Sequence, residues 1–183
     1  MIYELPVSVR IGDAEYPIRS DYRAVLDICT ALSDHELDDR SKAYVALTIF
    51  YPGFEDMPRD HHEEALKRCF WFINCGSEED RTQKAPKLMD WEQDFQYLVA
   101  PINRVIGREV RSMQYLHWWS LLSAYMEIGG DCTFAQIVSI RDKQARGKKL
   151  EKHEQEWLRR NRHLVDFKRK CTQADDDLLK QWI

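Results

Sequence analysis

The sequence predicts a mainly α-helical fold, in which an N-terminal β-hairpin is followed by a bundle of about six to seven helices. Apolar residues recur at the 3.6-residue period of an amphipathic helix from about residue 22 onward, whereas residues 7–18 alternate apolar and polar side chains. The chain of 183 residues also contains only 7 glycines and 6 prolines. This content is low for a loop-rich β-sandwich and favours helices.

The first element is expected to be a hairpin over residues 7–18. Its two strands flank Gly12-Asp13, a pair that suits a two-residue turn resembling type II′. Prolines at positions 6 and 17 favour an edge strand over a central one. Because an isolated hairpin is marginally stable in water, we expect it to pack on the helices or to pair with another chain.

Three helices are expected before residue 74. Ser20-Asp21 can cap the first, whose apolar residues run from Tyr22 to Leu32. Residues 43–51 are apolar on nearly every side, which predicts a short buried helix that ends at Pro52-Gly53. Pro58 fits the first turn of the third helix. Its expected apolar stripe comprises Ala65, Leu66, Cys69, Phe70 and Ile73.

A polar segment at residues 74–89 separates these helices from the rest. Its 16 residues are long for a connection inside a compact domain. The sequence therefore predicts an N-terminal lobe at 1–73, a linker or loop at 74–89, and a helical C-terminal lobe at 90–183. A single compact domain is the alternative.

The C-terminal half shows further helix signals. Two residue pairs match the capping-box pattern at the start of a helix, namely Asp90 with Gln93 and Thr133 with Gln136. Pro101 should kink the first of these helices before Gly107 ends it. Three more helices are expected. The first is marked by residues 115–125 and ends at Gly129-Gly130, and the second starts at Thr133 and stops near Gly147. The third is a charged amphipathic helix at 150–161.

Charge is distributed unevenly along the chain. Residues 141–171 contain 12 Lys/Arg against 5 Asp/Glu, whereas residues 1–140 contain 14 against 23. The candidate basic patch consists of Arg141, Lys143, Arg146, Lys148, Lys149 and Lys152. Such a patch can bind phosphates, form a solvated helix face, or dock on an acidic surface of the same or a neighbouring copy. The acidic remainder disfavours nucleic acid as the partner.

Several functional classes lose support. The sequence contains no run of about 18 apolar residues, which a membrane-spanning helix would need. The first residues do not resemble a signal peptide. Five cysteines without a CxxC pair suggest reduced thiols in a cytoplasm. His61 and His62 with Cys69 and Cys75 lack zinc-ligand spacing, and we expect two solvent-facing histidines and two buried thiols instead. Nucleotide-binding and hydrolase motifs are missing, so we expect neither an enzyme nor a cofactor.

The tripeptide His117-Trp118-Trp119 is the most unusual local feature. Core packing explains adjacent tryptophans on a helix most simply. The alternative is an aromatic anchor at a protein interface, with one ring at the rim. The candidate protein-binding residues are Tyr115, Trp118, Trp119, Trp157 and Leu158.

Three segments of the sequence resemble the bacteriophage Gp-fifteen family. They are Met89-Asp90-Trp91-Glu92-Gln93-Asp94, Leu116-His117-Trp118-Trp119, and Phe134-Ala135-Gln136-Ile137-Val138-Ser139-Ile140-Arg141. Members belong to long-tailed phages of Gram-positive hosts and are typically encoded between the tail-tube and tape-measure genes. The N-terminal hairpin is similar to the start of tail assembly chaperones.

The resemblance implies a tail-assembly chaperone that binds the tape-measure protein and other tail proteins, and that self-associates. It implies action in the cytoplasm of the bacterial host, absence from the mature virion, and no contact with a membrane. The alternatives are a structural tail or connector component of the virion and, less favoured, a nucleic-acid-binding regulator. The resemblance carries over no catalytic residue.

Overall fold

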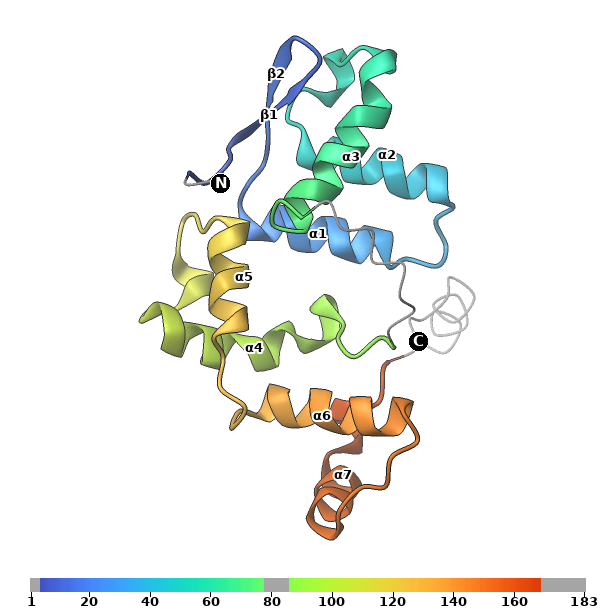
Figure 1. Cartoon of the computed structure of the whole chain (residues 1–183), viewed down its shortest axis with the longest axis vertical. Coiled ribbons are helices and arrows are strands. Elements are labelled where there is room, and N and C mark those ends of the chain that lie inside the picture. The colour runs from blue at the N-terminus through green and yellow to red at the C-terminus, as the bar shows by residue number, and fades with distance from the viewer. Residues whose placement is uncertain (1–3, 78–85, 169–183) are drawn as a thin grey trace, which may run out of the picture.

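The computed structural model describes residues 4–77 and 86–168. Within these ranges it confirms a mainly α-helical fold with an N-terminal two-stranded hairpin and seven α-helices (Figure 1). The strands are β1 (Ser8–Ile11) and β2 (Ala14–Pro17), and the α-helices are α1 (Tyr22–Leu32), α2 (Asp39–Phe50), α3 (His62–Ile73), α4 (Trp91–Ile106), α5 (Trp118–Met126), α6 (Thr133–Ala145) and α7 (Lys152–Val165). Three short 3₁₀ turns, η1 (Phe54–Asp56), η2 (Arg59–His61) and η3 (Val110–Ser112), complete the described elements.

The hairpin packs on the helices. Ile11 pairs with Ala14 in the antiparallel register, so the loop is Gly12-Asp13. Gly12 has a φ of +57° while Asp13 has a negative φ, as a type II′ turn requires. The buried side of β1 contacts α3, and the Tyr16 hydroxyl lies 2.8 Å from His61 Nδ1. These contacts supply the support that an isolated hairpin lacks.

The first helix matches its prediction, whereas the next two differ in detail. Asp21 caps α1 by accepting a hydrogen bond from the Arg23 amide. The second helix starts earlier than expected, because Asp38 caps it at residue 39. It is also not buried on all sides, since Tyr44 is 59% exposed.

The buried face of α3 is rotated relative to the predicted stripe. Phe72 is fully buried, whereas the predicted core residue Phe70 is 39% exposed. Residues 74–77 and 86–89 contain no helix or strand. The middle of the predicted linker, 78–85, lies outside the described residues.

The fourth helix is capped by Asp90, but Gln93 does not complete the capping box. Asp94 accepts the hydrogen bond from the Asp90 amide instead. The Gln93 side chain bonds to the segment after α7, where it donates to the Asp166 carbonyl and accepts from the Lys168 amide. The helix runs unbroken through Pro101 and ends at Gly107 in the left-handed region, with φ +80°.

The last three helices require further corrections. The fifth begins at Trp118 with His117 as its cap, so Tyr115 precedes it, and it ends at Met126 before Gly129. Cys132, rather than Thr133, caps α6 through its sulfur. The seventh extends to Val165 across a non-helical residue, Asn161. Residues 169–183 of the predicted C-terminal lobe lie outside the described ranges.

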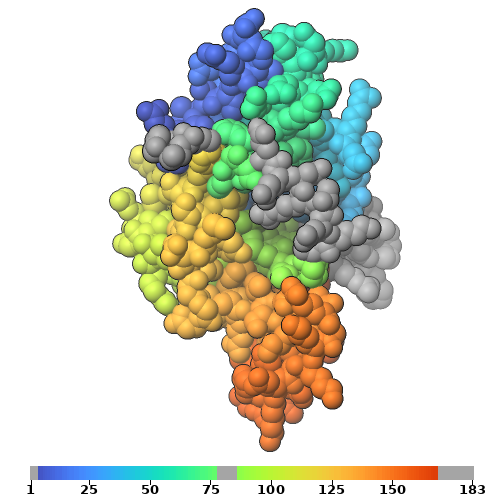
Figure 2. Space-filling view, viewed as in Figure 1, coloured from blue at the N-terminus to red at the C-terminus, as the bar shows by residue number. Residues whose placement is uncertain are grey.

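One hydrophobic core includes residues from both sides of segment 74–89, from Val9 to Phe134. Trp118 connects the two sides of this segment, because its indole N–H donates a hydrogen bond to the Ile73 carbonyl at 2.9 Å. The seventh helix packs mainly on α6. Together α6 and α7 form the lower end of the elongated molecule, opposite the hairpin (Figures 1 and 2).

Candidate protein-binding site

The two adjacent tryptophans have different environments. Trp118 is 1% exposed and therefore cannot be a surface anchor. Its inclusion among the candidate protein-binding residues was wrong. Trp119 is half-buried, its ring stacks on Phe72 at 5.8 Å, and its indole N–H donates to the Phe72 carbonyl. Core packing therefore explains Trp118, while part of Trp119 stays accessible to a partner.

Tyr115 lies at the surface in an extended segment before α5. The backbone fixes this segment, because the Asp21 carboxylate accepts a hydrogen bond from the Leu116 amide and the Leu116 carbonyl accepts one from Tyr22. The Tyr115 ring is 50% exposed, and its hydroxyl lies 2.8 Å from the hydroxyl of buried Ser20. The ring is thus presented in a defined orientation rather than left free to rotate.

An open groove of about 640 Å³ lies beside Tyr115, between α1 and α2. We call it the Tyr115 groove. Its apolar lining consists of Ile18, Ala24, Ile49 and Tyr115. Its charged lining consists of Arg19, Asp21, Arg23 and Asp27. Arg19 donates to the carbonyls of Thr48 and Ile49, which holds the end of α2 against this surface.

The remaining predicted binding residues, Trp157 and Leu158, lie elsewhere. Both are half-buried on α7, at the opposite end of the molecule from the hairpin and α3 (Figure 1). The structure therefore does not join them with Tyr115 in one surface.

The predicted basic patch is smaller than expected. Arg141 is 4% exposed and cannot belong to a surface patch. Lys143 pairs with Glu154 at 2.6 Å, and Arg146 pairs with Asp142 at 2.7 Å. The exposed lysines that remain are Lys148, Lys149 and Lys152.

Arg141 instead joins α6 to α4. Its guanidinium bonds to both oxygens of fully buried Asp94, at 2.6 and 3.1 Å, and Phe167 stacks over it at 4.1 Å. The other hydrogen bonds go to the backbone carbonyls of Leu88, Leu164 and Val165. Sequence reasoning missed this pair. The available signal was a charged residue at an apolar helix position, where Arg141 follows the buried positions Ile137 and Ile140.

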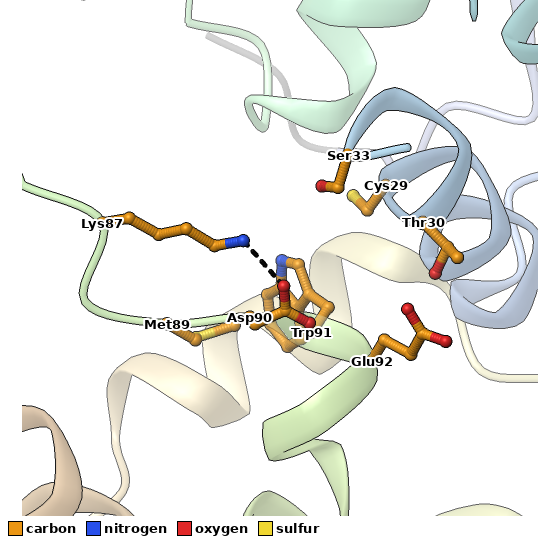
Figure 3. A pocket seen from close by; sticks show the side chains of 8 residues that line it. All are labelled: Cys29, Thr30, Ser33, Lys87, Met89, Asp90, Trp91 and Glu92. Carbon is orange, nitrogen blue, oxygen red and sulfur yellow. Dashed lines mark hydrogen bonds and ion pairs between the residues drawn. The ribbon is translucent and has the colours of Figure 1, made fainter. Parts of the chain in front are cut away.

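A small hollow of about 60 Å³ lies between the end of α1 and the start of α4. Its wall includes Cys29, Ser33 and the Lys87–Asp90 ion pair of 2.7 Å (Figure 3). Burial raises the pKa of the Cys29 thiol to about 11. This thiol is therefore protonated at neutral pH, which disfavours a role as a nucleophile.

The histidine and cysteine cluster considered for zinc has other contacts. His61 bonds to the Tyr16 hydroxyl and His62 to the Met57 carbonyl, and both are half-buried rather than solvent-facing. Cys75 is exposed, contrary to expectation, whereas Cys69 is buried. Among the described residues, no three potential ligands come together as a metal site.

A comparison with protein-family models matches residues 1–167 to the family described as Bacteriophage Gp15 protein. The chain belongs to this family. A search of curated proteins and a search of solved structures returned no match. In the part of the chain that the structure describes, no helix has the length and apolar character needed to cross a bilayer.

In this Gp15 family member, the segments that carry the resemblance build the interior. Asp90 and His117 cap helices, Trp118 fills the core, and Asp94 pairs with Arg141. They therefore specify the fold, and the candidate binding surface lies beside them at Tyr115.

Proposed function

We propose that this phage protein is a tail-assembly chaperone that binds the tape-measure protein while the tail tube forms around it. It acts in the cytoplasm of the bacterial host, in many copies, and leaves before the virion is complete. Its other partners are tail proteins and further copies of itself. It works by binding alone, without a cofactor or a catalytic step.

The Tyr115 groove is the observation that carries this proposal. A tape-measure protein is a long, helix-rich chain, and its apolar stripes would aggregate if left uncovered. An amphipathic helix binds a groove through apolar anchors flanked by charges. The groove offers this combination, because its lining includes the apolar residues Tyr115 and Ile49 together with arginine and aspartate side chains.

The environments of the buried polar groups support binding rather than catalysis. Asp94 and Arg141 satisfy each other, Glu154 pairs with Lys143, and His117 bonds to the Pro6 carbonyl and the Trp119 amide. Each of these groups stabilises the fold. A general acid or base would need to face a substrate.

Co-expression with the tape-measure protein, followed by pull-down, tests the proposal. We expect the wild-type chain to retain the tape-measure protein and Tyr115→Ala to retain several-fold less, because truncation of an aromatic anchor removes much of its binding energy. Met126→Ala is the matched control, since Met126 is 80% exposed on α5 and does not line the groove. Equal retention of an unrelated phage protein would refute the proposal.

A structural component of the tail or connector is the competing function. Quantitative mass spectrometry of purified particles separates the two, because a chaperone should be present at trace level at most. Stoichiometric recovery would favour the structural component.

A further inference from the structure

Charge is separated along the long axis of the molecule. The described N-terminal residues, 4–77, contain 8 Lys/Arg against 14 Asp/Glu, whereas residues 141–168 contain 10 against 5. The hairpin and α3 lie at one end, and α7 lies at the other (Figure 1). One end is therefore acidic and the other basic, which creates attraction between the unlike ends of two copies.

The basic end carries two exposed arginines on α7. Arg159 and Arg160 are exposed, and among the described residues neither has an ion-pair partner. Trp157 on the same helix is half-buried and lies outside the main hydrophobic core and the residues packed against it. Trp157 lies two positions before Arg159, so the two side chains are on nearly opposite sides of the helix. We therefore call Arg159 and Arg160 alone the α7 face.

The acidic end combines two exposed carboxylates with an exposed aromatic ring. Tyr44 is 59% exposed, and its ring packs edge-on against Phe54 at 5.5 Å. Glu55 and Asp56 follow Phe54 directly in η1 and are both exposed. In the described ranges neither carboxylate is in an ion pair. Tyr44, Glu55 and Asp56 form what we call the α2–η1 surface.

We propose that the α7 face of one copy binds the α2–η1 surface of a second copy, head to tail. Arg159 and Arg160 match the two carboxylates in charge, and either guanidinium can also stack on the Tyr44 ring. The α7 helix lies at the lower end of the molecule (Figure 2), where it can contact a neighbouring copy. The two surfaces differ, so a pair of copies keeps one unused surface at each end, and further copies extend it into an open chain or close it into a ring.

This inference deepens the proposed function, on which its biological use rests. A row of copies would present a row of Tyr115 grooves, and linked weak sites hold a long partner more firmly than separate ones. The test below uses the purified chain alone. Its outcome is therefore independent of the tape-measure pull-down.

Sedimentation velocity of the full chain provides the first measurement. We expect concentration-dependent association at about 50 mM NaCl that is largely lost at about 500 mM, because salt screens exposed charges. A monomer at low salt, or association that salt does not change, would overturn the inference. Association that nuclease treatment removes would overturn it in favour of nucleic-acid binding by the basic end.

Two neutralising variants test the pairing. Arg159→Gln with Arg160→Gln neutralises the α7 face, and Glu55→Gln with Asp56→Asn neutralises the carboxylates of the α2–η1 surface. Each should associate roughly tenfold more weakly than the wild type, since every exposed pair contributes modestly. At a concentration where neither variant associates alone, an equimolar mixture should form a one-to-one dimer, because a single unweakened junction remains.

A control keeps the change in charge but moves it away from both surfaces. Arg104 and Arg108 are exposed near the end of α4, and Arg104→Gln with Arg108→Gln should associate like the wild type. Circular dichroism verifies that all variants are folded. A mixture that fails to dimerise, or a control that weakens association equally, would contradict the head-to-tail contact.

Discussion

Replacement of Arg141 by methionine should detach the α6–α7 hairpin from the rest of the molecule. The guanidinium is the main polar link between α6, α4 and the segment after α7, and it joins side chains 47 positions apart. Methionine retains much of the apolar volume but makes none of the hydrogen bonds. The change therefore isolates the polar contribution of this residue.

The structure sets the expected magnitude. The side chains of Arg141 and Asp94 are 3% and 0% exposed, so removal of the cation leaves a buried carboxylate without its partner. Such a loss costs about 3–5 kcal/mol of unfolding free energy. Because each kcal/mol shifts the melting temperature of a protein of about 150–250 residues by about 2–4 °C, the melting temperature should fall by roughly 6–20 °C.

Urea denaturation followed by circular dichroism measures this change, and hydrogen exchange locates it. We expect amides of α6 and α7 to lose protection before those of α1 and α4. Arg104→Met is the control, because Arg104 is 71% exposed and 3.9 Å from its partner Asp131, and it should change stability by less than about 0.5 kcal/mol. A loss below about 1 kcal/mol for Arg141→Met would refute the reasoning.

Three further predictions concern the core and the helix ends. Burial lowers the pKa of His117, so the unfolded chain takes up a proton on this side chain at a higher pH than the folded chain does. The contribution of His117 to the unfolding free energy should therefore be fully present above about pH 6.5 and be lost as the pH falls below it. Urea midpoints of wild type and His117→Gln, measured across this range, should show that the substitution removes the pH dependence. Trp118→Ala should cost about 3–5 kcal/mol because it empties a buried site, and thermal melts should rank it well above Trp119→Ala. Gly107→Ala should cost about 1–2 kcal/mol, because φ is +80° there, and the same melts should show a smaller cost for Gly53→Ala, where φ is −107°.

Local signals predicted much of the helical framework. Asp21 and Asp90 cap helices because their short carboxylates reach nearby backbone amides, which depends only on neighbouring residues. The start of α2 was missed, since its first turn is polar and its hydrophobic stripe begins later, whereas its end before Pro52-Gly53 was predicted. Cys132 was missed as a cap because sulfur is a weak acceptor.

Long-range pairing could not be predicted in the same way. The sequence places Trp118 and Trp119 on neighbouring parts of a helix, but only packing against the end of α3 decides which ring is buried. Arg141 resembled a member of a basic run until its partner in α4 was known. The groove beside Tyr115 depends on the approach of α1, α2 and the segment before α5, which no local pattern encodes.

The solubility of the tape-measure protein during co-expression tests the central claim most directly. With the wild-type chain present, we expect most of the tape-measure protein to remain in the supernatant after centrifugation, and with Tyr115→Ala we expect a larger pelleted fraction. An equal pelleted fraction with and without the chain would contradict the proposed chaperone function.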